Sequence, residues 1–225
     1  MPTADLMAGH LTLPRFRSGG CYPPRMPGPR EVEIKFVLQD VKDMERRLRR
    51  AGFRRKTQRT HEMNTLYDLP SGEMRSRGEV LRLREYGGHW TLTHKSRGRS
   101  GRHKTRIENE TSVSNGAQTE AILVALGYRP TFRYEKYRTE WTDGSGHVVL
   151  DETPIGNFGE IEGPPSWIDH ITHTLNIPKD PCCTQSYGQL FMDWKRRTRN
   201  SARNMMFEET GRKARGAKHK RTSAR

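Results

Sequence analysis

The sequence of 225 residues has little cysteine and no long apolar segment. Its cysteines are Cys21 and the adjacent Cys182 and Cys183, which offer neither a disulfide framework nor the spacing of a metal site. We therefore expect a reducing compartment and a cytoplasmic location. No apolar stretch approaches the ~20 residues that cross a bilayer, and the first thirty residues lack the apolar core of a signal peptide. We expect no membrane partner.

The net charge of +15 is concentrated at the two ends of the chain. Residues 195–225 hold twelve lysines and arginines against Glu208 and Glu209, a net charge of +10. Residues 1–30 hold four arginines against Asp5, a net charge of +3. The part between them, residues 31–194, therefore carries only +2.

These differences divide the chain into three parts. Residues 1–30 are rich in proline and glycine and are expected to be a disordered extension, within which Met26 is an alternative start. Residues 31–194 are expected to form one domain. Residues 195–225 are expected to be a disordered polybasic tail. Such a tail, together with the basic loop 97–104, is expected to contact nucleic acid weakly through the phosphates. The alternative is that the tail only keeps the protein soluble.

The first predicted strand shows the pattern on which the domain is built. In Glu31-Val32-Glu33-Ile34-Lys35-Phe36 charged and apolar residues alternate, and only a β-strand places alternate residues on one face. Taken alone, the pattern also fits a strand whose charges simply face water.

The same alternation of charge returns along the chain. Pairs or triplets at every second position lie on further predicted strands: Arg82 and Arg84; Arg106, Glu108 and Glu110; Lys136 and Arg138; Glu160 and Glu162. Other strands are expected over 64–69, 89–95 and 147–150, with helices over 40–51, 118–126, 166–175 and 187–194. The order of these elements predicts an α+β fold.

An antiparallel sheet of this length must close or be covered at its edges. Closure with the charged faces inward gives a barrel with a charged lumen and helices on its apolar outside. Lysine and arginine suit phosphate oxygens, and carboxylates suit Mg²⁺ or Mn²⁺, so the inferred ligand is a metal–polyphosphate. The alternative is an outward-facing sheet whose charges pair with each other.

The ordered motifs resemble one protein family. They are Glu31-x-Glu33-x-Lys35, Tyr67-Asp68, Leu81-Arg82-Leu83-Arg84, Leu92-Thr93-His94-Lys95, Lys104-x-Arg106-x-Glu108-x-Glu110, Lys136-x-Arg138, Leu150-Asp151 and Gly159-Glu160-Ile161-Glu162-Gly163. In this order they resemble the CYTH superfamily, or triphosphate tunnel metalloenzymes, which includes class IV adenylate cyclases and thiamine triphosphatases. The resemblance covers residues 31 to about 194.

The resemblance implies an eight-stranded antiparallel β-barrel tunnel that binds a triphosphate with Mg²⁺ or Mn²⁺. The implied metal-facing acids are Glu31, Glu33, Asp151, Glu160 and Glu162. The implied phosphate-binding residues are Lys35, Arg82, Arg84, Lys95, Arg106, Lys136 and Arg138. Glu108 and Glu110 match further acidic tunnel positions. Because no Ser-His-Asp or Cys-His arrangement is evident, we expect a metal-activated nucleophile and no covalent intermediate.

Two departures from the family bear on the substrate. Many members carry an acid where this chain has Asn64, and thiamine triphosphatase-like members carry a lysine at the start of the last helix, where residues 184–187 have none. We therefore expect an adenylate cyclase that converts ATP to cyclic AMP and pyrophosphate. The alternatives are hydrolysis of tripolyphosphate or thiamine triphosphate and, in another class, binding of polyphosphate or RNA. A second copy of the chain is a candidate partner in a homodimer.

Overall fold

The computed structural model describes residue 28 and residues 30–99, 101–178 and 182–214. The disordered extension expected over residues 1–30 lies almost wholly outside these residues, and so does the end of the expected tail, residues 215–225. Within the described residues, no helix combines the length and the apolar character needed to cross a membrane.

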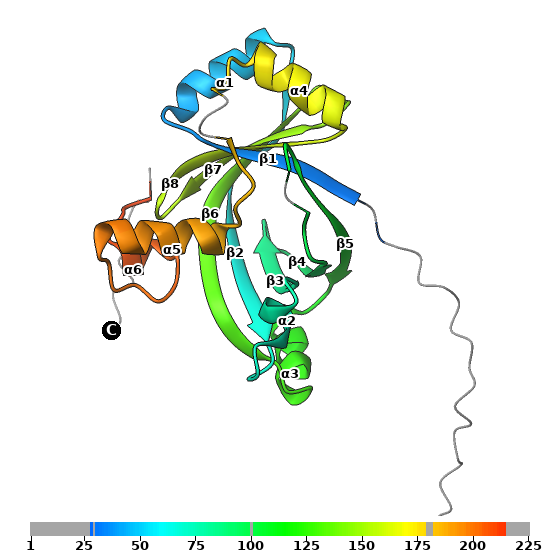
Figure 1. Cartoon of the computed structure of the whole chain (residues 1–225), viewed down its shortest axis with the longest axis vertical. Coiled ribbons are helices and arrows are strands. Elements are labelled where there is room, and N and C mark those ends of the chain that lie inside the picture. Colours follow the sequence, from blue (N-terminus) through cyan, green and yellow to red (C-terminus); the bar gives the residue numbers. More distant parts are fainter. Residues whose placement is uncertain (1–27, 29, 100, 179–181, 215–225) are drawn as a thin grey trace, which may run out of the picture.

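Eight antiparallel strands form a closed barrel (Figure 1), which confirms the predicted fold class. Around the barrel the order is β5-β4-β3-β2-β6-β7-β8-β1, and β1 pairs again with β5 to close the sheet. A short strand, β9 (Cys182–Cys183), pairs with the later part of β1. The eight strands are β1 (Arg30–Val37), β2 (Arg54–Asp68), β3 (Val80–Tyr86), β4 (His89–Lys95), β5 (Lys104–Val113), β6 (Arg129–Thr142), β7 (His147–Thr153) and β8 (Gly156–Glu162).

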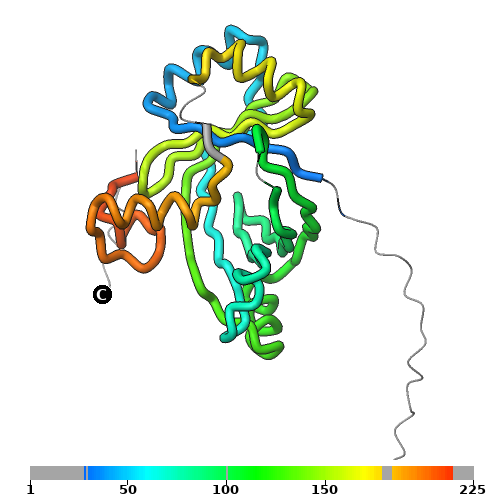
Figure 2. The backbone as a smooth tube through the Cα atoms, viewed as in Figure 1, coloured from blue at the N-terminus to red at the C-terminus, as the bar shows by residue number. Residues whose placement is uncertain are grey.

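The main apolar core lies outside the barrel, as the alternation of β1 predicts. Ile34 and Phe36 pack outward against helices α1 (Val41–Arg50) and α4 (Pro165–Thr174). Figure 2 shows these two helices side by side across β1, at one end of the molecule. Helix α1 begins where the Asp40 side chain accepts hydrogen bonds from two backbone amides, an arrangement that stabilises a helix start. With the apolar side chains packed outside, the charged face of β1 is left to line the lumen.

A second core lies under helix α5 (Tyr187–Thr198), against the outer side of the barrel (Figure 1). Here the structure corrects the domain boundary predicted at Trp194. Helix α5 continues to Thr198, and the chain then packs back on β6 through Met205, which is fully buried. Backbone hydrogen bonds join Met205 to Arg133 and Glu135. A short helix, α6 (Phe207–Thr210), follows. The segment folds because its few apolar residues complete this core. Its high net positive charge had predicted a disordered tail instead.

Several local predictions also need correction. Strand β2 begins ten residues earlier than predicted because its first half forms a largely exposed ribbon with β6 and has no apolar face. Helix α2 (Glu73–Ser76) was not predicted. The backbone N–H groups of Met74 and Arg75 in this helix donate hydrogen bonds to the Asp68 carboxylate. Helix α4 spans Pro165–Thr174, so it begins and ends one residue earlier than predicted. Helix α3 (Gly116–Ala125) covers the far end of the barrel beside β3.

Candidate active site in the barrel lumen

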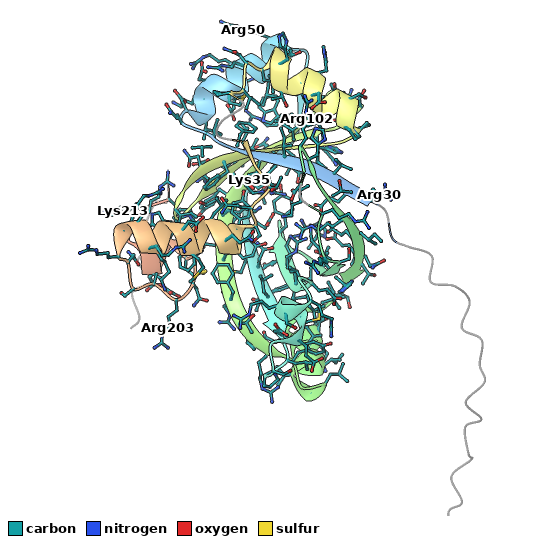
Figure 3. The ribbon with its side chains drawn as sticks, in the orientation of Figure 1. Arg30, Lys35, Arg50, Arg102, Arg203 and Lys213 are labelled. Atoms are coloured by element: carbon teal, nitrogen blue, oxygen red, sulfur yellow. The ribbon has the colours of Figure 1, made fainter. Side chains whose placement is uncertain are left out.

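The register of β1 sets the composition of the site. Glu33 lies opposite Glu162 of β8 and Lys35 lies opposite Glu160, while on the other side Glu31 lies opposite Arg106 of β5. Cross-strand partners point to the same face of a sheet. The charged face of β1 therefore meets charged faces on both neighbours, and Lys35, labelled in Figure 3, lies below β1 near the centre of the molecule.

These faces enclose a cavity of about 620 Å³. Apart from Asp151, every site residue predicted from the sequence lines it. The predicted lining residues are Glu31, Glu33, Lys35, Arg82, Arg84, Lys95, Arg106, Glu108, Glu110, Lys136, Arg138, Glu160 and Glu162. The alternative of an outward-facing charged sheet is therefore wrong.

One cluster of ion pairs lies between β1, β6, β7 and β8. Lys35 contacts Glu160, and Arg138 lies 2.5 Å from the second oxygen of the same carboxylate. Burial by itself would raise the pKa of Glu160, but these two cations hold it well below its usual range. Burial by itself would lower the pKa of Lys35, but the carboxylates of Glu160 and Glu33 outweigh it and raise that pKa. Both groups are therefore charged at neutral pH.

The structure places Asp151 behind this cluster and not at the cavity surface. The side chain is fully buried and accepts hydrogen bonds from Lys136 at 2.9 Å, from Arg138 at 2.7–2.8 Å and from the Tyr187 hydroxyl at 2.6 Å. The predicted metal-facing position of Asp151 is thus not observed, because its neighbours cover it and use both of its oxygens. In this position Asp151 orients the two cations that line the cavity.

A second cluster lies between β1, β4 and β5. Lys95 lies 2.6 Å from Glu108 and 3.0 Å from Glu31, and Arg106 lies 3.0 Å from Glu31. Burial opposes ionisation of Glu31, but Lys95 and Arg106 outweigh it and lower the pKa to about 2. Burial and the charge of Glu31 raise the pKa of Glu108.

A third cluster lies on β3, β4 and β5. Arg84 contacts Glu110 at 3.1 Å, and Arg82 lies 3.4 Å from the other oxygen of that carboxylate. Thr93 donates a 2.7 Å hydrogen bond to the same oxygen. Arginine pairs a planar set of donors with carboxylate or phosphate oxygens. An arriving phosphate can therefore replace the carboxylate as the partner of these side chains.

Several site residues were not predicted as such. Lys104 and Tyr134 line the cavity at lumen positions, two residues before Arg106 and Lys136 respectively. Lys104 stood in the alternating motif without an assigned role, and extending the alternation of β6 by one step would have found Tyr134. Buried Glu62 lies behind Lys136 and Arg138, at 3.4 and 3.6 Å. Asn64, which the sequence marked only as a departure from the family, donates a hydrogen bond to Glu62. Tyr187 was not predicted and lines the cavity from the start of α5. No sequence signal marks Tyr187.

The carboxylates at one end of the cavity fit a divalent cation. The Glu162 carboxylate makes no ion pair or hydrogen bond within the described residues, although Glu33 lies directly opposite it. Desolvation and the charges of Glu31, Glu160 and Glu33 raise the pKa of Glu162 to about 7. Like charges in such positions repel each other, and a bound cation would relieve the repulsion.

These carboxylates suit a metal ion that is bound jointly by the protein and a ligand. Within the described ranges, no three histidine, cysteine, aspartate or glutamate side chains form a ready metal site. Mg²⁺ commonly takes only one or two carboxylates and completes its coordination with water and substrate phosphates. The donor set therefore suits a metal that binds together with a phosphate compound.

Comparisons with known proteins agree with this geometry. A Methanocaldococcus jannaschii protein provisionally named an adenylate cyclase is 26% identical over 171 residues, covering 71% of this chain and 97% of that protein. A Vibrio parahaemolyticus structure, also a provisionally assigned adenylate cyclase, is similar with a TM-score of 0.66 at 18% identity, covering 73% of this chain and 99% of that one.

A third similar structure comes from Hippeastrum. It is a provisionally assigned adenylyl cyclase described as having a dominant triphosphatase activity; the TM-score is 0.56 at 18% identity, covering 72% of this chain and 95% of that one. At such identities the two structures establish the fold. The model of the CYTH domain family matches residues 29–175, about two thirds of the sequence. The chain belongs to the CYTH domain family.

Proposed function

We propose that this protein is a divalent-metal-dependent enzyme that acts on a triphosphate substrate. The observation that carries the proposal is the convergence of lysines and arginines from five strands on one cavity. They are Lys35, Arg82, Arg84, Lys95, Lys104, Arg106, Lys136 and Arg138. Buried charges need partners, and phosphate oxygens are well suited to a cavity lined in this way.

The cations would bind the phosphate chain and stabilise the negative charge that develops on the departing phosphate. Such stabilisation by fixed charges is the main contribution of proteins to phosphoryl-transfer reactions. The carboxylates behind the cations, Glu62 and Asp151, keep the cationic side chains oriented before substrate arrives.

No side chain at the cavity is placed as a covalent nucleophile. Among the described lining residues there is no histidine or cysteine. The hydroxyl of Ser186 is used at the start of α5, where it accepts a hydrogen bond from the Gln189 amide. The attacking group is therefore part of the substrate or is water.

A divalent cation would be held by Glu33 and Glu162, with Glu31 and Glu160 beside them. When bound, it would activate the nucleophile and neutralise phosphate charge. The proposal covers both Mg²⁺ and Mn²⁺, since both ions prefer oxygen donors.

For the reaction itself we propose cyclisation of ATP, in which the ribose 3′-hydroxyl attacks the α-phosphorus and pyrophosphate leaves. A few apolar or aromatic side chains among the lining residues support a nucleoside. Leu66, Val80 and Tyr134 line the cavity from β2, β3 and β6. The names of the Methanocaldococcus and Vibrio proteins point to the same reaction.

The second candidate is hydrolysis of a triphosphate, in which water attacks the terminal phosphorus. It is favoured by the small share of apolar side chains among the lining residues, since most of the cavity wall would contact phosphate and little would contact a base. The activity described for the Hippeastrum protein is of this kind.

The test is a turnover panel of ATP, tripolyphosphate and thiamine triphosphate with Mg²⁺ or Mn²⁺, with the products identified. We expect cyclic AMP and pyrophosphate from ATP, and loss of turnover in Lys95→Ala. Hydrolysis of tripolyphosphate without any cyclic AMP from ATP would replace cyclisation by the second candidate. Absence of metal-dependent turnover of all three compounds would contradict an enzymatic role in the barrel lumen.

A further inference from the structure

The outer face of helix α1 is strongly basic. Its exposed residues Lys42, Arg46, Arg49 and Arg50 lie at positions i, i+4, i+7 and i+8, so they share one face of the helix. The apolar residues of α1 pack on the other face, against the main core. Residues 40–59 carry nine lysines and arginines against three acids, a net charge of +6. Because residues 31–194 carry +2 in total, the remainder of the domain carries −4.

The acids of α1 neutralise only part of this charge. Asp43 is shared by two arginines, at 2.9 and 2.7 Å, and Glu45 is shared by two others, at 3.3 and 3.2 Å. The side chains of Lys42 and Arg50 make no ion pair or hydrogen bond within the described residues. Six cations therefore face two carboxylates. We define the α1 surface as these six cations, Lys42, Arg46, Arg47, Arg49, Arg50 and Arg55.

The α1 surface is held in place and lies apart from the lumen. The guanidinium groups of Arg49 and Arg55 lie 5.1 and 5.0 Å from the centre of the Trp141 ring, and a cation over an aromatic ring is attracted to it. Figure 3 shows Arg50 at the end of the molecule formed by α1 and α4. None of the six cations lines the lumen cavity. The surface can therefore bind a ligand of its own.

The spacing of the cations suits a row of phosphates. From Lys42 to Arg50 the helix rises about 12 Å, and one strand of a duplex places a phosphate about every 3.4 Å along its axis. The α1 surface can therefore contact several phosphates of one backbone. Contacts of this kind are independent of base sequence and weaken as the salt concentration rises.

The surroundings of the cations favour a duplex over a single strand. Proteins that bind single strands combine a basic surface with aromatic rings on which unpaired bases stack. Here the ring that the arginines cover, Trp141, is only 1% exposed, and Phe53 beside it is likewise buried. The α1 surface thus offers charges for phosphates and no ring for a base.

A membrane surface fits the same cations less well. A helix that lies on a membrane inserts its apolar face between the lipids while its basic face contacts the headgroups. The apolar residues of α1, Val41, Met44 and Leu48, are buried in the main core of the protein. Only the charged face is therefore available to a partner.

We propose that the α1 surface binds the phosphate backbone of a double-stranded nucleic acid, independently of base sequence. The sequence had placed such contacts in the tail and in the loop 97–104, whereas the α1 surface belongs to the folded domain. The inference does not depend on the proposed function, since the six cations lie outside the lumen. The competing role is that of a solvated basic face that only keeps the protein soluble.

The test is fluorescence anisotropy of a short labelled duplex with 5′-hydroxyl ends, which carry no terminal phosphate that could enter the lumen. Binding is measured from about 50 to 200 mM salt. One variant of the full chain combines Lys42→Gln, Arg46→Gln, Arg49→Gln and Arg50→Gln. The slope of log K against log salt concentration should become shallower by about one for each cation that contacts a phosphate. Binding at about 100 mM salt should weaken at least tenfold.

A matched control removes the same charge from another exposed part of the chain, beside α5 and away from Arg50 (Figure 3). It combines Arg197→Gln, Arg199→Gln, Arg203→Gln and Lys213→Gln, and it should bind the duplex as wild type does. An equal loss in both variants would show that only the net charge matters and would overturn the inference. Wild-type affinity and slope in the α1 variant would overturn it too.

Further ligands test the choice of partner. Duplex DNA and duplex RNA share the phosphate chemistry, and binding of either one through the α1 surface supports the proposal. Tighter binding of the corresponding single strand, or binding of phosphatidylserine vesicles in place of the duplex, would contradict it. Thermal melts establish that each variant is folded. If the fourfold variant does not fold, Lys42→Gln with Arg50→Gln replaces it, because this pair removes no ion pair of the described residues.

Discussion

The hydroxyl of Tyr187 donates a 2.6 Å hydrogen bond to Oδ2 of Asp151, joining the start of helix α5 to the fully buried acid of the barrel. The Tyr187 ring also lies under two lumen cations, with Nζ of Lys35 and of Lys136 4.7 and 4.6 Å from its centre. A cation over an aromatic ring is attracted to it. Tyr187 therefore contacts both the cations and the acid that orients one of them.

The first prediction follows from this contact. Tyr187→Phe keeps the ring and removes the hydrogen bond to Asp151, whose bond to Lys136 remains. Hydrogen bonds to charged groups contribute about 1.5–3 kcal/mol, so we expect at least a tenfold lower kcat/KM on the preferred triphosphate. Steady-state kinetics provide the measurement. The matched control is Tyr137→Phe, because Tyr137 packs against Arg59 on the outer face of β6, and it should leave kinetics unchanged.

The second prediction separates stability from activity at the carboxylates. The Glu162 carboxylate has no ion-pair or hydrogen-bond partner within the described residues and faces Glu33, so Glu162→Gln should not lower the melting temperature. It should reduce metal-dependent turnover by at least about a hundredfold. Loss of a residue that supports a metal ligand commonly lowers activity ten- to a hundredfold, and we expect the upper end of that range here.

Glu31→Gln is the contrasting variant for that experiment. It removes a partner from Lys95 and Arg106, and leaving buried cations without a counter-charge is destabilising. We expect both melting temperature and turnover to fall. Wild-type turnover in Glu162→Gln would remove Glu162 from the proposed metal site.

The third prediction concerns acid stability. Burial would raise the pKa of Glu62, but Lys136, Arg138 and other cations outweigh it and hold the pKa at about 2, below the usual 4.5. The folded state then binds fewer protons than the unfolded state between these values. The stabilisation is complete above pH ~4.5 and is lost as the pH falls toward 2. Its size is roughly 3 kcal/mol.

Urea unfolding from pH 6 to pH 3 checks this expectation. Glu62→Gln cannot ionise, so the free energy of unfolding should fall less steeply with acidification than in wild type. Parallel curves for the two proteins would show that the ionisation of Glu62 does not contribute to stability.

The fourth prediction tests the corrected domain boundary. Met205 is fully buried in the core under α5, and truncation of such a side chain to alanine costs about 2–5 kcal/mol. We expect Met205→Ala, or a chain that ends at Trp194, to melt at a clearly lower temperature. Met192→Ala is the matched control, since Met192 is 56% exposed. An unchanged melt of the chain ending at Trp194 would restore the boundary predicted from the sequence.

Alternation, combined with the need of a long antiparallel sheet to close its edges, predicted the barrel and most of its lumen. A β-strand sends every second side chain to the same face, so Glu31, Glu33 and Lys35 had to share one side once β1 was a strand. Charges cannot form a packed core, and this placed them in the lumen. The same local rule placed Lys104 on the face of Arg106, Glu108 and Glu110, although the sequence assigned it no role.

The tertiary structure alone decided which of these residues line the cavity. Asp151 follows the alternation yet is covered by Lys136, Arg138 and Tyr187. Its depth depends on the register of β6 and β7 and on a tyrosine 36 residues further along the chain. Likewise, Met205 anchors a segment whose composition is that of a disordered tail. Burial is the outcome of packing between residues distant in sequence, and local periodicity carries no information about it.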